Sequence, residues 1–419
     1  MATSLKYCGL ISPLEKELDE WRKRLQHSFS PQHTLLFHQL ADNTARIPEN
    51  YNVEWSQFVG GAYSCRSCYD YHNIARNYNY EYESFSSTLN DSKDVFVRKA
   101  KTHDGSLELQ NLIKNGNSGD RQEVLDGIIG SIFEVMLDPH GHHLFRRILE
   151  FCDSSQLDTI FVNLTSSKEL LINTSLMQYG SSAVQRFIKR IKNTELGQFV
   201  AIILSMRFVE LMTSEHGRFV VQECFYTFEP KENEVLFTCA ISYLKEVATT
   251  QYGCSSLNVC LSCITGAQRQ QLLKSIVHKS DFLANDPYGN YVVQEVLMLR
   301  NDEITKKICD RLKRDYLRLS FKRSGSRVVE KCIQASEYGL DSVVESLLSS
   351  EKSLVLLARD RFGNYVIQTA LQTAKASNIK HYESLVTVLK AQRSALPHIK
   401  LGKHILNHIE DVQNNVENV

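Results

Sequence analysis

The sequence has little proline, no long apolar run and no excess of either charge. Only seven of its 419 residues are proline, and four of these come after Asn90, so that part of the chain can be helical almost throughout. No apolar run approaches the roughly 20 residues of a transmembrane helix, so we expect no membrane span. Lys and Arg number 48, as do Asp and Glu, which argues against binding through a generally basic surface.

Motifs for disulfides, metals and catalysis are also scarce. The 11 cysteines are an odd number and the sequence starts without the apolar stretch of a signal peptide, so we expect a reduced, intracellular protein with free thiols. Cys65 and Cys68 have metal-ligand spacing, as do Cys260 and Cys263, but neither pair has a second pair at zinc-finger distance. We expect Cys260 and Cys263 in the core, no metal and no other cofactor. Because nucleotide-binding loops and nucleophile motifs are missing, we expect no enzymatic activity.

The first 84 residues differ in composition from the rest of the chain. Eight of the 18 tyrosines come before residue 90, and Gly60–Ser87 is rich in Tyr, Asn and Ser, so we predict that residues 1–84 are mostly disordered. One short helix is predicted over residues 13–27, because Ser12 and Glu15 form a capping-box motif and apolar residues follow at helical spacing. Such a helix either packs on its own protein or binds a partner.

The remainder of the chain carries an internal repeat built around glycine. A glycine followed by a short helical pattern recurs at intervals of 36 to 39 residues. The nine repeat glycines are Gly105, Gly141, Gly180, Gly217, Gly253, Gly289, Gly325, Gly363 and Gly402. An Asp-Pro pair precedes two of them, at 138–139 and 286–287, which is typical of a helix cap. We therefore predict that each glycine opens a helix.

The helix after Gly289 shows what each repeat contributes. Its apolar face consists of Val292, Val293, Val296 and Leu297. Asn290, Tyr291 and Gln294 lie on the other face. A helix that is buried on one side and polar on the other, repeated in this way, builds an all-α solenoid with a lined inner surface. Because Asn290 and Gln294 are four residues apart, their amides are predicted to project side by side and grip the edge of a flat heterocycle, while Tyr291 covers its face.

The spacing and these polar triplets resemble the PUF (Pumilio) family of RNA-binding proteins. The similarity covers about residues 85–419 and includes a terminal GKHIL segment at 402–406, which is typical of the family's last, capping unit. The resemblance implies a right-handed α-solenoid, a crescent of eight three-helix repeats with terminal capping helices. It also implies single-stranded RNA as the ligand on the concave face, because in these repeats two or three side chains read one base.

In the family, the first and fifth residues of a five-residue window after the glycine contact the base edge, and the second stacks on the base. The windows that match best here are Asn290/Tyr291/Gln294, Ser326/Arg327/Glu330 and Asn364/Tyr365/Gln368. Glu330 only accepts hydrogen bonds and suits the N1–H and N2–H donors of guanine, whereas Asn with Gln offers the donor and acceptor of a uracil edge. Because the family binds RNA antiparallel to its repeats, these windows are predicted to read 5′-UGU.

The other windows depart from the family pattern. They are Ser106/Leu107/Gln110, His142/His143/Arg146, Ser181/Ser182/Gln185, Arg218/Phe219/Gln222 and Cys254/Ser255/Asn258. The first and third resemble adenine readers without a planar stacking residue, and Phe219 keeps a stacking ring beside an unusual Arg218. Because His142 and His143 are adjacent, they are not expected to project together as a metal-ligand pair would on a helix. Since each stacked base contributes about 1–3 kcal/mol, we expect affinity to concentrate in the C-terminal third.

The resemblance implies a cytoplasmic, monomeric regulator that binds UGU elements in mRNA 3′ untranslated regions and represses translation or promotes decay. Protein corepressors are the implied partners, and the first 85 or so residues are the natural place to recruit them. A local basic strip is expected from Arg186, Lys189, Arg190, Lys322, Arg323 and Lys331. Two alternatives stay open: a diverged member that acts on pre-ribosomal RNA in the nucleolus, and a protein-binding helical solenoid that has lost RNA binding.

Overall fold

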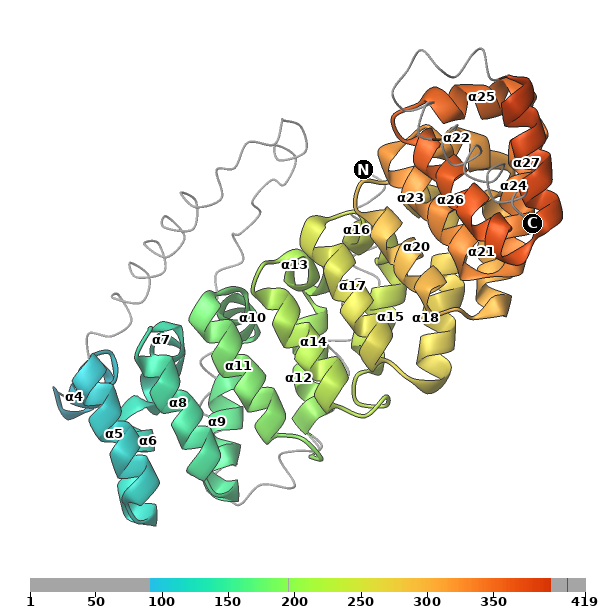
Figure 1. Ribbon diagram of the computed structural model, residues 1–419. Helices are drawn as coiled ribbons and strands as arrows, with labels where there is room; N and C mark the ends of the chain where they lie inside the picture. Colours follow the sequence, from blue (N-terminus) through green and yellow to red (C-terminus); the bar gives the residue numbers. More distant parts are fainter. Residues whose placement is uncertain (1–90, 195, 393–404, 406–419) are drawn as a thin grey trace, which may run out of the picture. The chain divides into compact units, whose positions relative to one another are not determined.

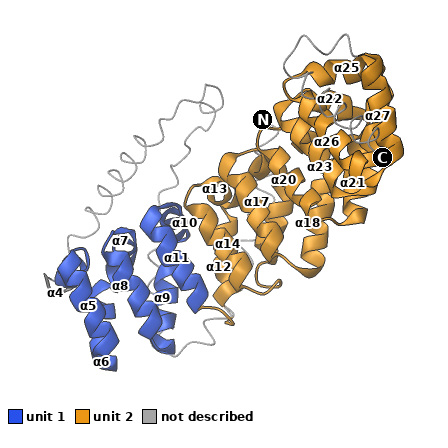
Figure 2. Ribbon diagram, viewed as in Figure 1, with its two compact units in different colours: residues 1–190 blue, residues 191–419 orange. Residues whose placement is uncertain are grey.

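The computed structural model describes residues 91–194, 196–392 and 405. Every regular element in these ranges is a helix and none is a strand, as predicted for an all-α chain (Figure 1). The chain divides into two compact units, one ending at Arg190 and the other beginning at Ile191 (Figure 2). Within the described ranges, no helix has the length and hydropathy of a bilayer span.

The described part of the first unit runs from α4 to α11. Its helices are α4 (Asp91–Ala100), α5 (His103–Asn115), α6 (Ser118–Ile128), the 3₁₀ helix η2 (Ile129–Ser131), α7 (Ile132–Leu137), α8 (Gly141–Phe151), α9 (Ser154–Ser166), α10 (Lys168–Leu176) and α11 (Gln178–Arg190). Polar caps define several of these ends. Asn117 forms a capping box with Asp120 before α6, and Asp153 forms one with Gln156 before α9.

The second unit runs from α12 to α27. Its helices are α12 (Leu196–Ser205), α13 (Phe208–Thr213), α14 (Gly217–Thr227), α15 (Glu234–Ser242), α16 (Leu244–Ala248), α17 (Gln251–Cys263), α18 (Gly266–His278), α19 (Ser280–Asn285), α20 (Gly289–Met298), α21 (Asp302–Leu312), the 3₁₀ helix η3 (Lys313–Asp315), α22 (Tyr316–Ser320), α23 (Arg323–Ala335), α24 (Glu337–Leu348), α25 (Glu351–Arg359), α26 (Gly363–Ser377) and α27 (Ile379–Ala391).

The helices recur in a fixed order. A short helix such as α7 leads into a helix with a repeat glycine in its first turn, such as α8, and a third helix such as α9 follows. We name the glycine-containing helices the lining helices; they are α5, α8, α11, α14, α17, α20, α23 and α26. Within the first unit α5 packs on α8 and α8 on α11, and within the second unit each lining helix from α14 to α26 packs on the next. This stacking of like helices is the arrangement predicted from the repeat.

The apolar face predicted for the helix after Gly289 is confirmed. Val292, Val293 and Val296 have no exposed surface, and Leu297 is 1% exposed. The equivalent residues of α8, Leu144, Phe145, Ile148 and Leu149, are buried as well. Burying a side chain of this size contributes about 1.5–3 kcal/mol, so the lining helices are anchored from behind and their opposite face is free to carry polar groups.

The repeat glycines are required by a close approach between backbones. A Cβ atom on Gly253 would lie 2.0 Å from the carbonyl oxygen of Val247, six residues earlier, and a Cβ atom on Gly141 would lie 2.5 Å from that of Val135. The same six-residue relation, also under 3.0 Å, holds at Gly105, Gly180, Gly325 and Gly363, whereas at Gly289 the carbonyl oxygen of Leu283 would lie 3.2 Å away. Because real Cβ contacts are essentially never shorter than 3.0 Å, only glycine lets the short helix end this near the lining helix.

The prediction that every repeat glycine opens a helix is wrong for four of them. Gly141, Gly217, Gly289 and Gly363 are the first residues of their helices, but Gly105, Gly180, Gly253 and Gly325 are the third. The difference lies in the residue three before the glycine. Asp286 Oδ1 accepts the N–H groups of Tyr288 and Gly289, at 2.8 and 2.7 Å, and holds a turn ahead of α20. Thr250 Oγ1 accepts only from Gly253, at 3.2 Å, and α17 begins directly after Thr250.

The Asp-Pro caps predicted from the sequence are confirmed. Asp138 repeats the contacts of Asp286, because its Oδ1 accepts the N–H groups of His140 and Gly141 at 2.7 and 2.8 Å. Each carboxylate therefore satisfies two backbone donors at a helix start, where no intrahelical partner exists.

Several sequence predictions fall outside the described residues. They are the disorder of residues 1–84, the helix at 13–27, the thiols of Cys65 and Cys68, and the ninth repeat glycine, Gly402. The domain boundary between residues 84 and 85 lies there too, and all of these stay predictions. Of the GKHIL segment only Ile405 is described, and it is helical and fully buried.

Candidate nucleic-acid interface

The window residues occupy three kinds of position at the start of the lining helices. On α20, Asn290 is 3% exposed, Tyr291 is 55% exposed and Gln294 is half-buried. The first position is also buried at Ser106, His142, Ser181, Cys254, Ser326 and Asn364. The second is also exposed at Leu107, His143, Phe219, Ser255, Arg327 and Tyr365. The fifth is also half-buried at Gln110, Arg146, Gln185, Asn258, Glu330 and Gln368.

The prediction that Asn290 and Gln294 project side by side is wrong for Asn290. Its Nδ2 donates to the backbone carbonyls of Asp286 and Pro287, both at 2.8 Å, and its Oδ1 accepts from Gln294 Nε2 at 2.8 Å. Carbonyls at a helix start attract a short amide side chain, so Asn290 turns inward. Gln294 alone presents its amide, with Oε1 and one N–H available for a uracil edge. Asn290 fixes which way that amide points.

The last window repeats this arrangement. Asn364 Nδ2 donates to the carbonyl of Asp360 at 2.7 Å, and Gln368 Nε2 donates to Asn364 Oδ1 at 2.8 Å. Tyr365 is 45% exposed beside them. The sixth and eighth windows are therefore built alike, as two uracil readers require.

A serine takes over the orienting role in two windows of the first unit. Gln110 Nε2 donates to Ser106 Oγ at 3.1 Å, and Gln185 Nε2 donates to Ser181 Oγ at 3.2 Å. Ser106 in turn donates to the carbonyl of His140 at 2.9 Å. The fifth-position amides are thus held in place, but neither window has a planar second residue to stack on a base.

The predicted guanine reader, Glu330, is bonded to a neighbouring side chain on the same helix. Arg327 Nη1 donates to its Oε2 at 3.2 Å, and the Arg327 guanidinium also lies over the ring of Tyr365, 5.4 Å from the centroid. Burial raises the pKa of Glu330 above the ordinary range, and the charge of Arg327 partly offsets this. The 5.4 Å between the Arg327 guanidinium and the Tyr365 ring centroid leaves no room for a stacked base, so Arg327 must leave Tyr365 before guanine enters between them.

The fourth window is organised around a cation. Arg218 is half-buried, its guanidinium lies 4.3 Å from the Phe219 ring centroid and 5.0 Å from that of Tyr252, and its Nε donates to the carbonyl of Glu215. Arginine offers no acceptor, so Nε2 of the buried Gln222 has no partner among the described residues. This window presents donors, which explains why it fits neither the adenine nor the uracil pattern.

The fifth window also contains an amide atom that has no hydrogen-bond partner among the described residues. Cys254 is buried and its thiol donates to the carbonyl of Gln251 at 3.2 Å, while Asn258 Oδ1 has no partner in the described part of the chain. Ser255 is exposed but lacks a planar group to stack on a base.

The rings of His142 and His143 are in contact, although the two residues are adjacent in the sequence. Their ring centroids are 3.8 Å apart, and the ring of Tyr179 stacks on His142 at 5.0 Å. His142 turns inward because its Nδ1 lies 3.0 Å from the carbonyl of Asp138, which brings its ring against its neighbour. Burial lowers the pKa of both histidines, and the charge of Arg146 lowers each further. Both shifts favour the neutral imidazole, and the two rings together with Tyr179 form an aromatic cluster.

One set of contacting residues was missed by the sequence analysis. Tyr179 and Tyr252 each lie directly before a repeat glycine and contact the first window residue of the preceding lining helix. The sequence did contain a pattern that could have identified them, because an aromatic residue or His stands directly before the glycine in most repeats. These residues are His140, Tyr179, His216, Tyr252, Tyr288 and Phe362.

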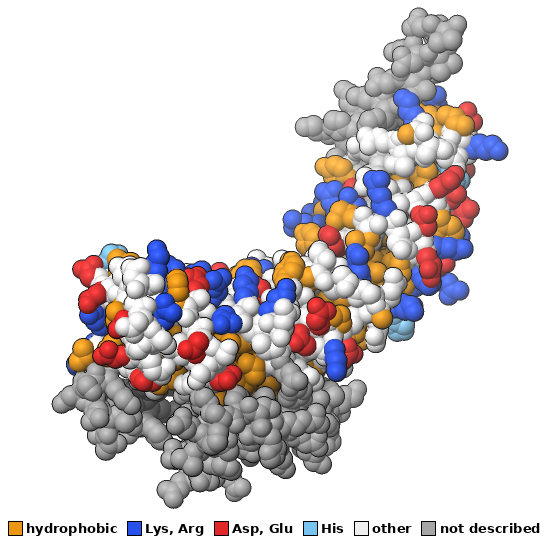
Figure 3. Space-filling view, turned by 90° about the horizontal axis from the view of Figure 1, so that it is seen from below, with side chains coloured by type: hydrophobic (Ala, Val, Ile, Leu, Met, Phe, Trp, Pro, Cys, Tyr) orange, Lys and Arg blue, Asp and Glu red, His pale blue; other side chains and the backbone are white. Residues whose placement is uncertain are grey.

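Two residues of the expected basic strip, Arg190 and Lys322, are bonded to other groups of the protein. Arg190 donates to the backbone carbonyls of Leu149 and Cys152, both at 3.1 Å, so it ties α11 to the end of α8. Lys322 donates to Asn285 at 2.8 Å. On the face drawn in Figure 3, cationic and anionic side chains are interspersed.

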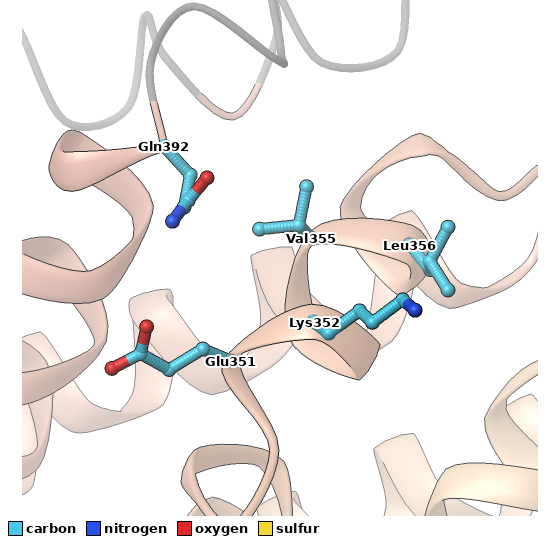
Figure 4. A pocket seen from close by; sticks show the side chains of 5 residues that line it. All are labelled: Glu351, Lys352, Val355, Leu356 and Gln392. Atoms are coloured by element: carbon cyan, nitrogen blue, oxygen red, sulfur yellow. The ribbon is translucent and has the colours of Figure 1, made fainter.

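Cys260, Cys263 and a hollow on the surface lie apart from the windows. Cys260 is buried, as predicted, but Cys263 is half-buried because α17 ends there. Among the described residues no three His, Cys, Asp or Glu side chains converge as metal ligands. An open hollow of about 470 Å³ lies beside α25, and no window residue lines it (Figure 4). Its lining consists of Glu351, Lys352, Val355, Leu356 and Gln392.

Comparison with known sequences identifies the repeat. The family described as NOP9-like PUF repeat domain matches residues 162–416, more than half of the chain, and the one described as Pumilio-family RNA binding repeat matches residues 131–165. Pumilio homolog 12 of Arabidopsis thaliana is 33% identical over 322 residues, which are 77% of this chain and 53% of that protein. Pumilio homolog 11 of the same plant is 30% identical over 306 residues, 71% of this chain and 54% of that protein. The chain spans about half the length of these relatives.

Solved structures agree with these sequence matches. A structure described as the Puf4 RNA binding domain bound to HO endonuclease RNA 3′ UTR recognition sequence superimposes with a TM-score of 0.67 and 26% identity, covering 74% of this chain and 97% of that one. The yeast Puf5p domain bound to AAT2 RNA, at 21% identity and a TM-score of 0.64, shares the fold. The predicted helical-repeat solenoid is thus confirmed, and the chain belongs to the PUF family of RNA-binding proteins.

Proposed function

We propose that the protein is a sequence-specific, single-stranded RNA-binding regulator that recognises 5′-UGU elements in mRNA 3′ untranslated regions. It would act in the cytoplasm as a monomer, by recruiting corepressors that block translation or promote decay. The observation that carries this proposal is the composition of three consecutive windows. Their fifth positions are Gln294, Glu330 and Gln368, and their second positions are the exposed Tyr291, Arg327 and Tyr365.

The packing of the helices supports reading these windows together. Lining helix α20 packs on α23 and α23 packs on α26, all within the second unit. The contact between Arg327 and Tyr365 spans the last two of these helices, so the second positions of adjacent windows are neighbours in space. A strand along this row would meet an amide, a carboxylate and an amide in succession, which suits U, G and U.

Selection of RNAs from a random pool by the full-length protein tests the proposal. We expect strong enrichment of UGU, with loose preference on its 3′ side, where the first five windows would lie. Enrichment of an unrelated motif would contradict the proposed base specificity. If the protein bound RNA but enriched no motif, only RNA binding without sequence preference would stand. Absence of any RNA binding would favour the protein-binding solenoid instead.

A second candidate is action on pre-ribosomal RNA, the alternative that the sequence left open. The match of residues 162–416 to the NOP9-like PUF repeat domain supports it. The two candidates differ in the RNA that the protein contacts inside cells. Crosslinking followed by sequencing would show reads in mRNA 3′ untranslated regions for the first and in pre-ribosomal RNA for the second.

A further inference from the structure

Cations are concentrated on two neighbouring lining helices of the first unit. Helices α8 and α11 pack on each other and carry five basic side chains against a single carboxylate, Glu150. The basic residues are Arg146, Arg147, Arg186, Lys189 and Arg190. Because Arg190 is bound to backbone carbonyls, the other four supply the charge of this surface.

Two of these arginines lie in register with the windows. Arg147 follows the exposed His143 by four residues, and Arg186 follows Ser182 by four residues. Residues four apart on a helix lie one above the other on the same face. Both guanidinium groups are therefore one helical turn beyond the second window position, next to the path that RNA bases would take.

Both arginines are held by the same carboxylate. Arg147 Nη1 lies 2.6 Å from Glu150 Oε2 and Arg186 Nη2 lies 2.8 Å from Glu150 Oε1, so one residue joins α8 to α11. One carboxylate neutralises one of two guanidinium charges, and each guanidinium has five N–H donors. The side chains of Arg147 and Arg186 are 36% and 38% exposed, so part of this donor set faces solvent.

The windows on these helices offer little for reading a base. On α8, His142 and His143 cover each other, and on α11, Ser182 has no planar group. RNA that crosses α8 and α11 therefore needs contacts of another kind. Arginine forks match the oxygen geometry of a phosphate group, and two of them held at fixed spacing lose little entropy on binding.

We propose that Arg147 and Arg186 form a binding site for a backbone phosphate of single-stranded RNA, which Glu150 keeps assembled when RNA is absent. This inference rests on the proposed RNA binding of the protein. The first unit then contributes affinity that is independent of sequence, whereas the windows of α20, α23 and α26 contribute base preference.

The test compares the variants Arg147→Ala/Arg186→Ala and Glu150→Gln with the full-length wild type. Dissociation constants are measured over a salt series for a UGU-containing RNA and for an RNA of the same composition without UGU. We expect the double variant to bind both RNAs roughly three- to tenfold more weakly. The slope of log affinity against log salt should become shallower by about 0.7 for each phosphate that the variant no longer neutralises.

Glu150→Gln should act in the opposite direction. It removes the negative charge that competes with phosphate, while the amide oxygen of the new side chain can still accept from a guanidinium and keep the site assembled. Both affinity and salt slope should therefore increase, which a folding defect cannot imitate. Arg318→Ala is the matched control, because this arginine is also paired with a carboxylate three residues away, but on a short helix outside the lining set.

Three outcomes would overturn the inference. They are an unchanged affinity and slope in the double variant, a loss confined to the UGU-containing RNA, and weaker binding of both RNAs by Glu150→Gln. Binding of polyglutamate that depends on the two arginines, with RNA binding unaffected, would instead assign the site to an acidic peptide. If the wild type lacks UGU preference but the slopes change as expected, the proposed base specificity fails and the phosphate site stands.

Discussion

At the scale of single residues, the windows on α5, α11, α20 and α26 each contain a pair in which one side chain reads and another orients it. Asn290 and Asn364 are buried and bonded to backbone carbonyls, and each accepts from the glutamine one turn later. A glutamine held in this way presents a defined donor and acceptor, and binding does not have to order a freely rotating amide.

Replacing Asn364 with Ala should therefore impair RNA binding without removing any group that faces the base. Gln368 loses its orienting acceptor and the carbonyl of Asp360 loses its side-chain donor, so we expect about 1–3 kcal/mol lower stability and roughly tenfold weaker binding to UGU RNA. Chemical denaturation and fluorescence anisotropy measure the two effects. Ser377→Ala, at an exposed position in the last turn of the same helix, is the control and should leave both nearly unchanged.

Glu330 should make guanine recognition sensitive to acid. Only the ionised carboxylate accepts both guanine donors, and because burial raises the pKa of Glu330, protonation begins at a higher pH than for an ordinary glutamate. UGU affinity should fall as the pH is lowered through that raised pKa, whereas folding stability should gain from this residue, since the folded state favours the protonated form.

Glu330→Gln should remove this pH dependence and weaken guanine preference at the second UGU position. Titration of UGU and UAU RNAs between neutral and mildly acidic pH measures both effects. An unchanged preference for guanine in the variant would mean that Glu330 does not face that base.

At the scale of elements, the repeat glycines set how closely a short helix can approach its lining helix. Gly253→Ala would bring a methyl group against the backbone carbonyl of Val247, which cannot rotate away. We expect a loss of about 1–3 kcal/mol in the free energy of unfolding, as for overpacking elsewhere. Gly130→Ala is the matched control, because nothing lies within 4 Å of the position that its added methyl group would take, and it should be neutral or slightly stabilising. Equal thermal shifts in the two variants would contradict the close-approach argument.

At the scale of the whole molecule, equal numbers of acidic and basic residues limit how much of the RNA affinity can come from attraction to phosphate groups. With few phosphate contacts, the slope of log affinity against log salt for UGU RNA should stay well below the value of about 5 that seven neutralised phosphates would give on a single strand. Anisotropy titrations over a range of salt concentrations test this for the full-length protein. A slope near 5 or above would mean that charge, and not base contact, dominates binding.

The fold was largely predictable because its signal is periodic. The glycine interval, the Asp-Pro caps at 138 and 286, and the apolar residues behind Asn290 all depend on local spacing, and the structure confirms them. The helix starts were less predictable. Whether a helix begins at Gly289 or two residues before Gly253 depends on how many backbone donors the preceding cap accepts.

The sequence by itself determined the order of the windows, since helical periodicity fixes which residues share a face. Only the tertiary structure decided which side chains turn inward. Asn290 bends onto carbonyls that the turn before α20 brings within reach, and His142 does the same and meets His143 and Tyr179. Likewise, Arg147 and Arg186 are 39 positions apart in the chain and share Glu150 because α8 packs on α11. Spacing along a helix cannot specify contacts between helices or with a cap, because those depend on how neighbouring backbones pack.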